Sequence, residues 1–112
     1  MEILNQLLKF RSERDWEQFH KPKDLAISLS LEAAELLECF QWKNDDEVEL
    51  MLKSQSKKNV EDEIADIAIY LNLLCHDLNI DLNQAILQKL RQNEEKYPIE
   101  KSKGSAKKYS EL

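Results

Sequence analysis

The sequence predicts an all-α fold that resembles a four-helix bundle with one short extra helix. Two observations support this prediction. The 112 residues include only one glycine and two prolines, which leaves little material for the many turns of a β-rich protein. Apolar side chains also fall on one arc of each long segment at about 100° per residue, as on the buried face of a helix.

The first two predicted helices are separated by the break HKPKD. The first covers about residues 2–19 and directs five side chains inward: Ile3, Leu4, Leu7, Leu8 and Trp16. Pro22 is acceptable near the start of the second helix, where its missing N–H is no loss. The second helix covers about residues 24–41, and because it has almost no charged face we expect it to be central.

A short helix and a long helix come next. The stretch EVELMLKS forms the short one, and Asp46 followed by Glu49 has the spacing of a capping box. Asn59 is suited to cap the long helix, which we expect to end near Asn79.

The last helix and the tail complete the fold. Asp81, with Gln84 three residues later, is a suitable N-cap for a helix that reaches about Lys96. We expect residues 1–98 to form one domain and residues 99–112 to form a mobile basic tail.

Composition and charge limit the function. The net charge of -6 disfavours binding to duplex nucleic acid, and no apolar stretch is long enough for a membrane span. Cys39 and Cys75 have apolar neighbours, so we expect free thiols in a reducing cytoplasm. A chain of this length buries only a modest core, which favours a homo-oligomer.

Two pairs of carboxylates lie inside apolar arcs. Glu32 and Glu35 are three residues apart in the second helix, and so are Glu63 and Asp66 in the long helix, so each pair shares a helix face. If the two arcs face each other, four like charges converge, which requires protonation or bound cations. Oxygen donors without a Cys–His set favour Mg²⁺ first and Mn²⁺ second. Alternatively, the pairs lie at the edges of the arcs and bind lysines.

A Mg²⁺ cluster in an acidic protein needs an anionic ligand to complete its coordination. Phosphate chains are the natural choice, because the cation neutralises phosphate charge and activates water for in-line attack. The metal prediction therefore points to an enzyme acting on a phosphate compound.

The motifs around these carboxylates resemble a known family. The order E-x-x-E, spacer and E-x-x-D is similar to the all-α nucleoside triphosphate pyrophosphohydrolases of the MazG-like superfamily. Five stretches are similar to its dCTP pyrophosphatase branch: ERDWEQFHKPKDL, EAAELLECFQW, DEIADIAIYL, KYP and KKYSEL. The resemblance covers nearly the whole chain. It implies hydrolysis between the α and β phosphates, release of a monophosphate and pyrophosphate, and a homo-oligomer, commonly a tetramer built from dimers.

The resemblance also implies roles for individual residues. It assigns Mg²⁺ to Glu32, Glu35, Glu63 and Asp66; we expect Glu63 to be essential and Glu35 to help deprotonate the attacking water. It further implies substrate contacts from Trp16, His20, Trp42, Tyr70, Lys89 and Asn93, with the tryptophans stacking on the base and the last two touching phosphate.

Without the resemblance, these six residues have plainer interpretations. The tryptophans are core or interface anchors, His20 is a surface or capping histidine, Tyr70 is a core residue, and the stripe containing Lys89 and Asn93 is a solvated face. Some relatives carry a histidine where this sequence has Leu7, so the base preference is less well defined than the reaction type.

The preferred interpretation is removal of unwanted or modified dCTP from the nucleotide pool. One alternative is a broader MazG-like pyrophosphatase that acts on several deoxynucleoside triphosphates or on a phosphoribosyl nucleotide. Another is a non-catalytic helical adaptor whose carboxylates bind basic partners.

Overall fold

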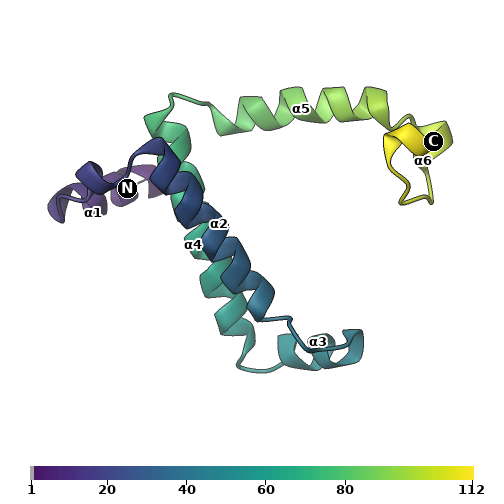
Figure 1. The fold of residues 1–112 in the computed structure, drawn as a ribbon, viewed down its shortest axis with the longest axis horizontal. Helices are drawn as coiled ribbons and strands as arrows, with labels where there is room; N and C mark the ends of the chain where they lie inside the picture. The colour runs from purple at the N-terminus through teal and green to yellow at the C-terminus, as the bar shows by residue number, and fades with distance from the viewer. Residues whose placement is uncertain (1) are drawn as a thin grey trace. The chain divides into compact units, whose positions relative to one another are not determined.

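The computed structural model describes residues 2–112, and within them every regular element is helical (Figure 1). The helices are α1 (Ile3–Glu13), α2 (Pro22–Glu38), α3 (Asp45–Leu52), α4 (Lys57–Asp77), α5 (Leu82–Lys96) and α6 (Ile99–Ser102), with 3₁₀ turns η1 (Glu17–Phe19) and η2 (Tyr109–Glu111). The prediction of an all-α protein is confirmed.

The chain forms two compact units, one ending at Asn79 and the other beginning at Ile80. The first contains α1 to α4 and the second contains α5 and α6. The expected division into a domain of residues 1–98 and a mobile tail of residues 99–112 stays a prediction.

The first unit is built on α2 and α4, which run side by side in opposite directions (Figure 1). They supply the buried hydrophobic side chains found among residues 2–112: Leu25, Val60, Leu73 and Cys75. The helix α1 contacts α4. Both cysteines are free thiols, as expected, although Cys39 is only half-buried. This pairing of α2 with α4 brings their carboxylates together.

The helix α1 is shorter than the predicted span of residues 2–19, because it ends at Glu13. The chain turns at Asp15, whose φ of 53° lies in the left-handed region that Asp tolerates better than most residues. The Trp16 N–H then donates to the Arg11 carbonyl over 3.1 Å, which closes the helix in the manner of a Schellman motif. The turn redirects the chain, so that Trp16 leaves the helical register of α1.

The helix α3 has a capping box two residues earlier than predicted. The Asn44 side chain accepts from the Glu47 N–H over 2.9 Å, and the Glu47 carboxylate accepts from the Asn44 N–H over 3.3 Å. The predicted pair of Asp46 and Glu49 is therefore wrong, because Asp46 already lies inside the helix. Two equivalent spacings compete here, and the Asn–Glu pair forms the cap.

The other long helices are close to their predicted spans. The helix α2 begins at Pro22, which occupies the first turn as expected. It ends at Glu38 rather than near residue 41. The helix α4 starts at Lys57, so the predicted cap Asn59 lies within its first turn and Ser56 precedes the helix without a side-chain cap.

The second unit begins with the predicted cap. The Asp81 carboxylate accepts from the Gln84 N–H over 3.1 Å, and α5 extends to Lys96 as expected. The Lys96 ammonium lies 4.9 Å from the ring centroid of Tyr109, and the Tyr97 ring meets the same ring edge to face. These contacts connect the end of α5 to η2.

Candidate active site

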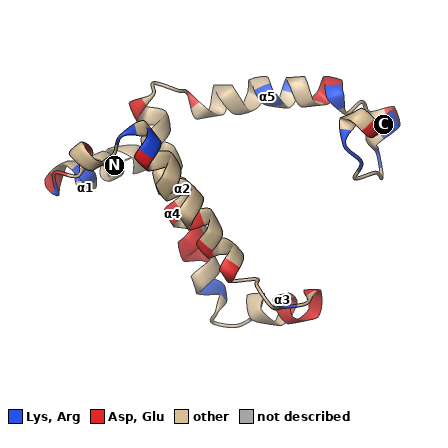
Figure 2. Cartoon of the chain, in the orientation of Figure 1, with Lys and Arg blue, Asp and Glu red and all other residues tan. Residues whose placement is uncertain are grey.

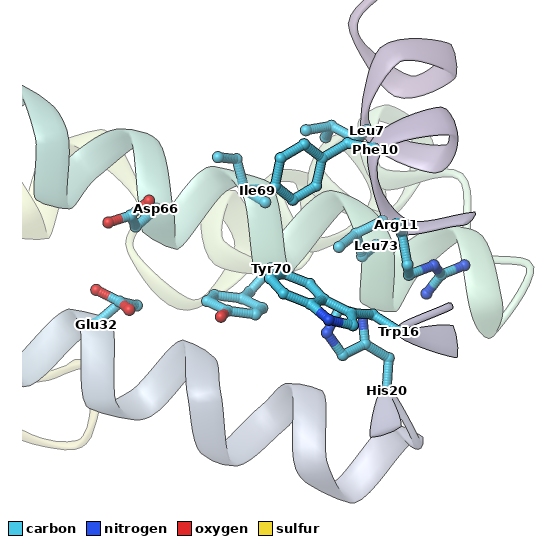
Figure 3. Close-up of a pocket in the computed structure, with 10 residues that line it drawn as sticks. All are labelled: Leu7, Phe10, Arg11, Trp16, His20, Glu32, Asp66, Ile69, Tyr70 and Leu73. Atoms are coloured by element: carbon cyan, nitrogen blue, oxygen red, sulfur yellow. The ribbon is translucent and has the colours of Figure 1, made fainter. Parts of the chain in front are cut away.

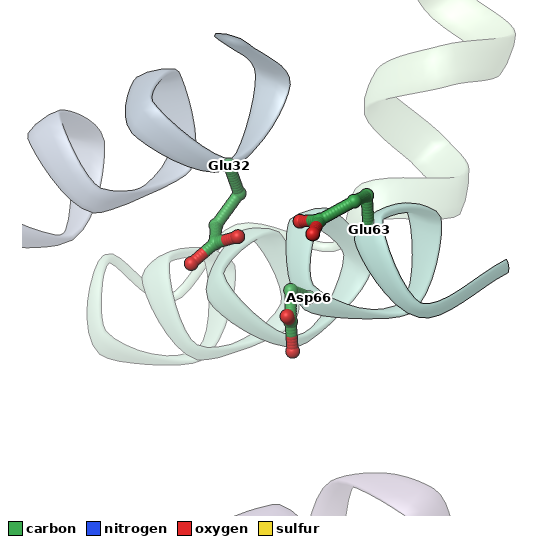
Figure 4. A group of neighbouring side chains, drawn as sticks. All are labelled: Glu32, Glu63 and Asp66. Carbon is green, nitrogen blue, oxygen red and sulfur yellow. The ribbon is translucent and has the colours of Figure 1, made fainter. Parts of the chain in front are cut away.

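Three carboxylates converge between α2 and α4 (Figure 4). Glu32 comes from α2, whereas Glu63 and Asp66 come from successive turns of α4. Each side chain is half-buried, and one oxygen from each lies within 4.8 Å of the others. Figure 2 shows acidic residues on both of these paired helices. The three-residue spacing in α4 and its contact with α2 thus assemble a concentrated negative charge.

Glu35 lies one turn after Glu32 on the same helix. Its side chain is exposed, and it is not one of the three whose oxygens meet. It still acts on the site, since hydrogen bonding and charge repulsion from Glu35 raise the pKa of both Glu32 and Glu63. All four carboxylates therefore interact, with Glu35 at the solvent side.

The cluster is electrostatically unfavourable without a cation. Burial, followed by the close carboxylates of Glu35 and Glu63, raises the pKa of Glu32 from 4.5 to about 7. Burial, then Glu35 and the Asp66 charge, raise the pKa of Glu63, whereas its hydrogen bond with Glu32 acts in the opposite direction. The Oε2 atoms of Glu32 and Glu63 are buried without a hydrogen-bond partner. Converging oxygen donors with unused capacity fit a hard divalent cation.

A cavity of about 320 Å³ adjoins the cluster (Figure 3). Glu32 and Asp66 line one end, which we call the acidic end. Trp16 and His20 line the other, the aromatic end, and Tyr70 lies between the two ends. The remaining lining residues are Leu7, Phe10, Arg11, Ile69 and Leu73. The cavity therefore combines carboxylates with a largely apolar compartment inside one unit.

The aromatic end is built from rings that contact one another at steep angles. The centroids of Trp16 and His20 are 6.3 Å apart, and those of His20 and Tyr70 are 6.2 Å apart. Phe10 meets Trp16 edge to face at 5.7 Å. Trp16 remains 42% exposed, so its ring retains a free surface on which a planar ligand could stack.

A part-buried ion pair that sequence reasoning missed connects α1 to α4 beside this cavity. The Arg11 guanidinium donates from Nη1 and Nη2 to the two Asp77 oxygens, over 2.8 and 2.9 Å. Arg11 is only 6% exposed, and its Nε has no partner. The helical spacing from the inward Leu4 and Leu7 could have indicated that residue 11 also points inward.

His20 lies near this ion pair. Burial, and then the Arg11 charge, lower the pKa of His20 from 6.5, while the Asp77 charge acts in the opposite direction. Its Nδ1 is buried without a partner. The ring is thus disposed to be neutral near pH 7 and has capacity for another hydrogen bond.

Three predicted substrate contacts are not among the residues that line the cavity. Trp42 follows α2 with a φ of 67° and is 91% exposed. Lys89 and Asn93 belong to α5 in the second unit, where they line a shallow depression with Ala85, Ile86 and Leu90. Of the ten predicted site residues, the first unit therefore gathers Glu32, Glu35, Glu63, Asp66, Trp16, His20 and Tyr70 around one cavity.

Membrane insertion has no support in the described helices, since none combines the length and hydropathy that crossing a bilayer requires.

Comparison with known proteins identifies relatives over most of the chain. The dCTP pyrophosphatase 1 of Bos taurus is 44% identical over 105 residues, and that of Homo sapiens is 40% identical. Each match covers 93% of this chain but 62% of the relative, so the chain spans less than two thirds of the length of these curated relatives.

A solved structure is also similar. The crystal structure of a pyrophosphatase from Archaeoglobus fulgidus has a TM-score of 0.81 and 46% sequence identity, covering 86% of this chain and 89% of that one. The MazG-like family model matches residues 27–112, a range that includes all four carboxylates. The fold, the acidic cluster and these matches agree, and the chain belongs to the MazG-like family.

Proposed function

We propose that this protein is a nucleoside triphosphate pyrophosphohydrolase that converts a deoxynucleoside triphosphate, with dCTP or modified dCTP favoured, to the monophosphate and pyrophosphate. The observation that carries the proposal is the cluster of Glu32, Glu63 and Asp66, of which Glu32 and Asp66 line one end of an aromatic-lined cavity. The relatives called dCTP pyrophosphatase 1 support the substrate, and the Archaeoglobus pyrophosphatase supports the reaction class.

The metal in this proposal is Mg²⁺, with Mn²⁺ as an alternative. Glu32, Glu63 and Asp66 would hold it, with Glu35 contributing from the solvent side. When bound, Mg²⁺ neutralises phosphate charge and increases the acidity of a coordinated water. Glu35 has the exposure required of a proton acceptor, and we assign it the removal of a proton from the attacking water.

The cavity would hold the nucleoside. Its volume of about 320 Å³ is at the lower end for ligand pockets, so it suits a base and sugar rather than a whole triphosphate. In this arrangement the base meets Trp16, His20 and Tyr70, and the phosphates extend to the acidic end. Sequence motifs alone support Trp42 as a second stacking residue and Lys89 and Asn93 as phosphate contacts.

The biological role in this proposal is nucleotide-pool sanitation in the cytoplasm by a homo-oligomer, either a dimer or a tetramer. Exposed apolar side chains on α2, among them Ile27, Leu31 and Leu37, are consistent with self-association.

The test is pyrophosphate release from dCTP and Mg²⁺, with and without EDTA. We expect EDTA to abolish turnover. Glu63→Gln should lose most activity, because the substitution removes a negatively charged metal ligand. It should keep its helical content, because glutamine has the same size as glutamate. Glu61→Gln is the matched control, since Glu61 lies on α4 with a side chain that is 57% exposed.

The outcomes separate the candidate functions. Similar rates with dATP, dTTP and dCTP would indicate the broad-specificity pyrophosphatase. No pyrophosphate from any nucleotide would favour the helical adaptor. Full turnover by a well-folded Glu63→Gln variant would contradict the assignment of that residue as an essential ligand.

A further inference from the structure

The hydrogen-bonding groups at the aromatic end are few, and they differ in kind. Trp16 offers a donor only, and the Arg11 guanidinium likewise offers donors only. Side-chain acceptors on the lining residues at this end come from the Tyr70 hydroxyl and from His20, and the His20 ring accepts only while it is neutral. The ability of this end to accept a hydrogen bond thus depends strongly on the charge of one ring.

The ion pair beside His20 is well placed to control that charge. Both terminal nitrogens of Arg11 are engaged by Asp77, so the guanidinium is held in one position beside the cavity. Arg11 also lines the cavity and is 6% exposed, so solvent screens its charge weakly. A cation fixed in this position disfavours a second positive charge on His20.

Resting on the proposed function, we propose that Arg11 offsets the Asp77 charge so that the buried His20 ring stays uncharged, and that the aromatic end therefore accepts a hydrogen bond from an amino-bearing base and selects cytosine over uracil. Arg11 is then a positioning residue that acts through His20. The two bases have the same ring and differ at position 4, where cytosine carries an amino donor and uracil an oxo acceptor.

No other charged group described around His20 is placed to control the charge of its ring in the same way. The groups that face His20 are Arg11 from α1, and Asp77 and Tyr70 from α4. Glu17, in the turn before His20, acts on Arg11, and His76 acts on Asp77. From α2 the cavity receives Glu32, at the acidic end. Burial and Arg11 both lower the pKa of His20, which agrees with the geometry.

The ion pair could instead simply fasten α1 to α4. Its two members have opposite effects on His20, which distinguishes the interpretations. Arg11→Met leaves the Asp77 carboxylate and should raise the pKa of His20. Asp77→Asn leaves the Arg11 charge and should lower it further. Loss of a structural contact alone would affect both variants in the same direction.

The first measurement is a proton NMR titration of the imidazole signals. The chain has two histidines, and the spectrum of His20→Gln identifies which signals belong to His20. We expect the His20 midpoint to move up in Arg11→Met and down in Asp77→Asn. Unchanged midpoints, or shifts in the same direction, would overturn the positioning role, and this result does not depend on any activity.

The second measurement is the ratio of kcat/KM for dCTP to that for dUTP, between about pH 6 and 8.5. Ionisation of the metal site and of the phosphates affects both nucleotides alike and cancels in the ratio. We expect the wild-type ratio to rise with pH as His20 loses its proton. Arg11→Met should lower the ratio about tenfold near pH 6.5, the value of one lost hydrogen bond.

Two further variants guard against misfolding. Arg11→Met combined with Asp77→Leu removes both charges, and it should restore the ratio to within about threefold of wild type, since burial alone disfavours charged His20. His20→Gln cannot titrate, so its ratio should not vary with pH. If Arg11→Met fails to fold, the wild-type profile and Asp77→Asn still decide the question.

The outcomes separate this inference from the proposed function. Equal kcat/KM for dCTP and dUTP in the wild-type protein would overturn the selectivity and leave the hydrolase intact. Failure of every nucleotide to release pyrophosphate would overturn the proposed function and with it the selectivity, while the NMR titration still tests the control of His20.

Discussion

At the residue scale, the ionisation of the acidic cluster has a direct consequence for stability. The folded protein binds the Glu32 proton more tightly than the unfolded chain does, because its pKa is raised from 4.5 to about 7. This contribution is fully present below the unfolded pKa and is lost as pH rises through the folded pKa. Glu63 contributes with the same sign. The metal-free protein should therefore carry an increasing electrostatic cost toward neutral pH.

We predict that, in EDTA, the thermal midpoint of wild-type protein falls relative to that of Glu32→Gln between about pH 5 and 8. His20, whose pKa is lowered, changes stability with pH in the opposite direction. Both proteins contain His20, so the difference between their midpoints isolates the contribution of Glu32. Excess Mg²⁺ should reduce the difference, since a cation offsets the repulsion. Differential scanning fluorimetry measures it, and parallel pH profiles for the two proteins would contradict the prediction.

The Arg11–Asp77 pair allows a second residue-level prediction. Asp77→Ala leaves a buried guanidinium without its counter-ion, which should destabilise the protein by about 3 kcal/mol. Replacing both residues, with Arg11→Met and Asp77→Leu, should cost much less because no charge remains unpaired. Urea denaturation monitored by circular dichroism gives both values. Equal losses in the two variants would mean that the pair acts only through packing.

Individual residues also define what the sequence could and could not predict. Glu32, Glu63 and Asp66 were predictable as neighbours, because helical spacing places each pair on one face and apolar flanks orient those faces together. Arg11 was harder to place: its spacing from Leu4 and Leu7 puts it on the inward face, but its charge favours the solvated side of a helix. Its burial depends on Asp77, sixty-six positions later, and local pattern contains no information about that pairing.

At the scale of elements, helix types and order follow from periodicity, whereas helix ends depend on single hydrogen bonds. The span predicted for α1 ran past its true end because EQF continues a helical pattern. The left-handed turn at Asp15 is stabilised by two backbone hydrogen bonds that periodicity cannot reveal. At α5 one strong cap candidate was present, and Asp81 was identified correctly.

The cap of α3 supplies an element-level prediction. Asn44→Ala removes a reciprocal pair of hydrogen bonds at the helix start and should cost about 1 kcal/mol of stability. Asp46→Ala is the matched control, since this acidic residue lies in the first turn without capping it, and it should cost only about 0.3 kcal/mol through the helix dipole. Urea denaturation compares the two; a larger loss for Asp46→Ala would show that the cap is misassigned.

At the scale of the whole molecule, more large hydrophobic side chains are exposed than buried in residues 2–112. Such an imbalance is uncommon in a stable monomer, because apolar burial is the main favourable term in folding. In the second unit, Ile86, Leu87 and Leu90 form an exposed stripe along α5. Composition indicated that assembly was plausible, but no local pattern could define which surfaces take part.

We predict that light scattering will give a mass of at least twice the chain mass of 13.2 kDa. Leu90→Glu should reduce that mass, because it places a charge in the apolar stripe of α5. Gln88→Glu, an exposed substitution on the same helix, should leave the mass unchanged. A monodisperse 13.2 kDa species for the wild-type protein would contradict the prediction of a homo-oligomer.

The small buried core of the first unit has a consequence for handling the protein. If neighbouring chains cover the exposed apolar surface, folding and association form a single equilibrium, and the melting temperature then rises with protein concentration. Dilution alone would loosen the helices that hold the carboxylates, so specific activity would fall at nanomolar enzyme even with saturating cation and nucleotide.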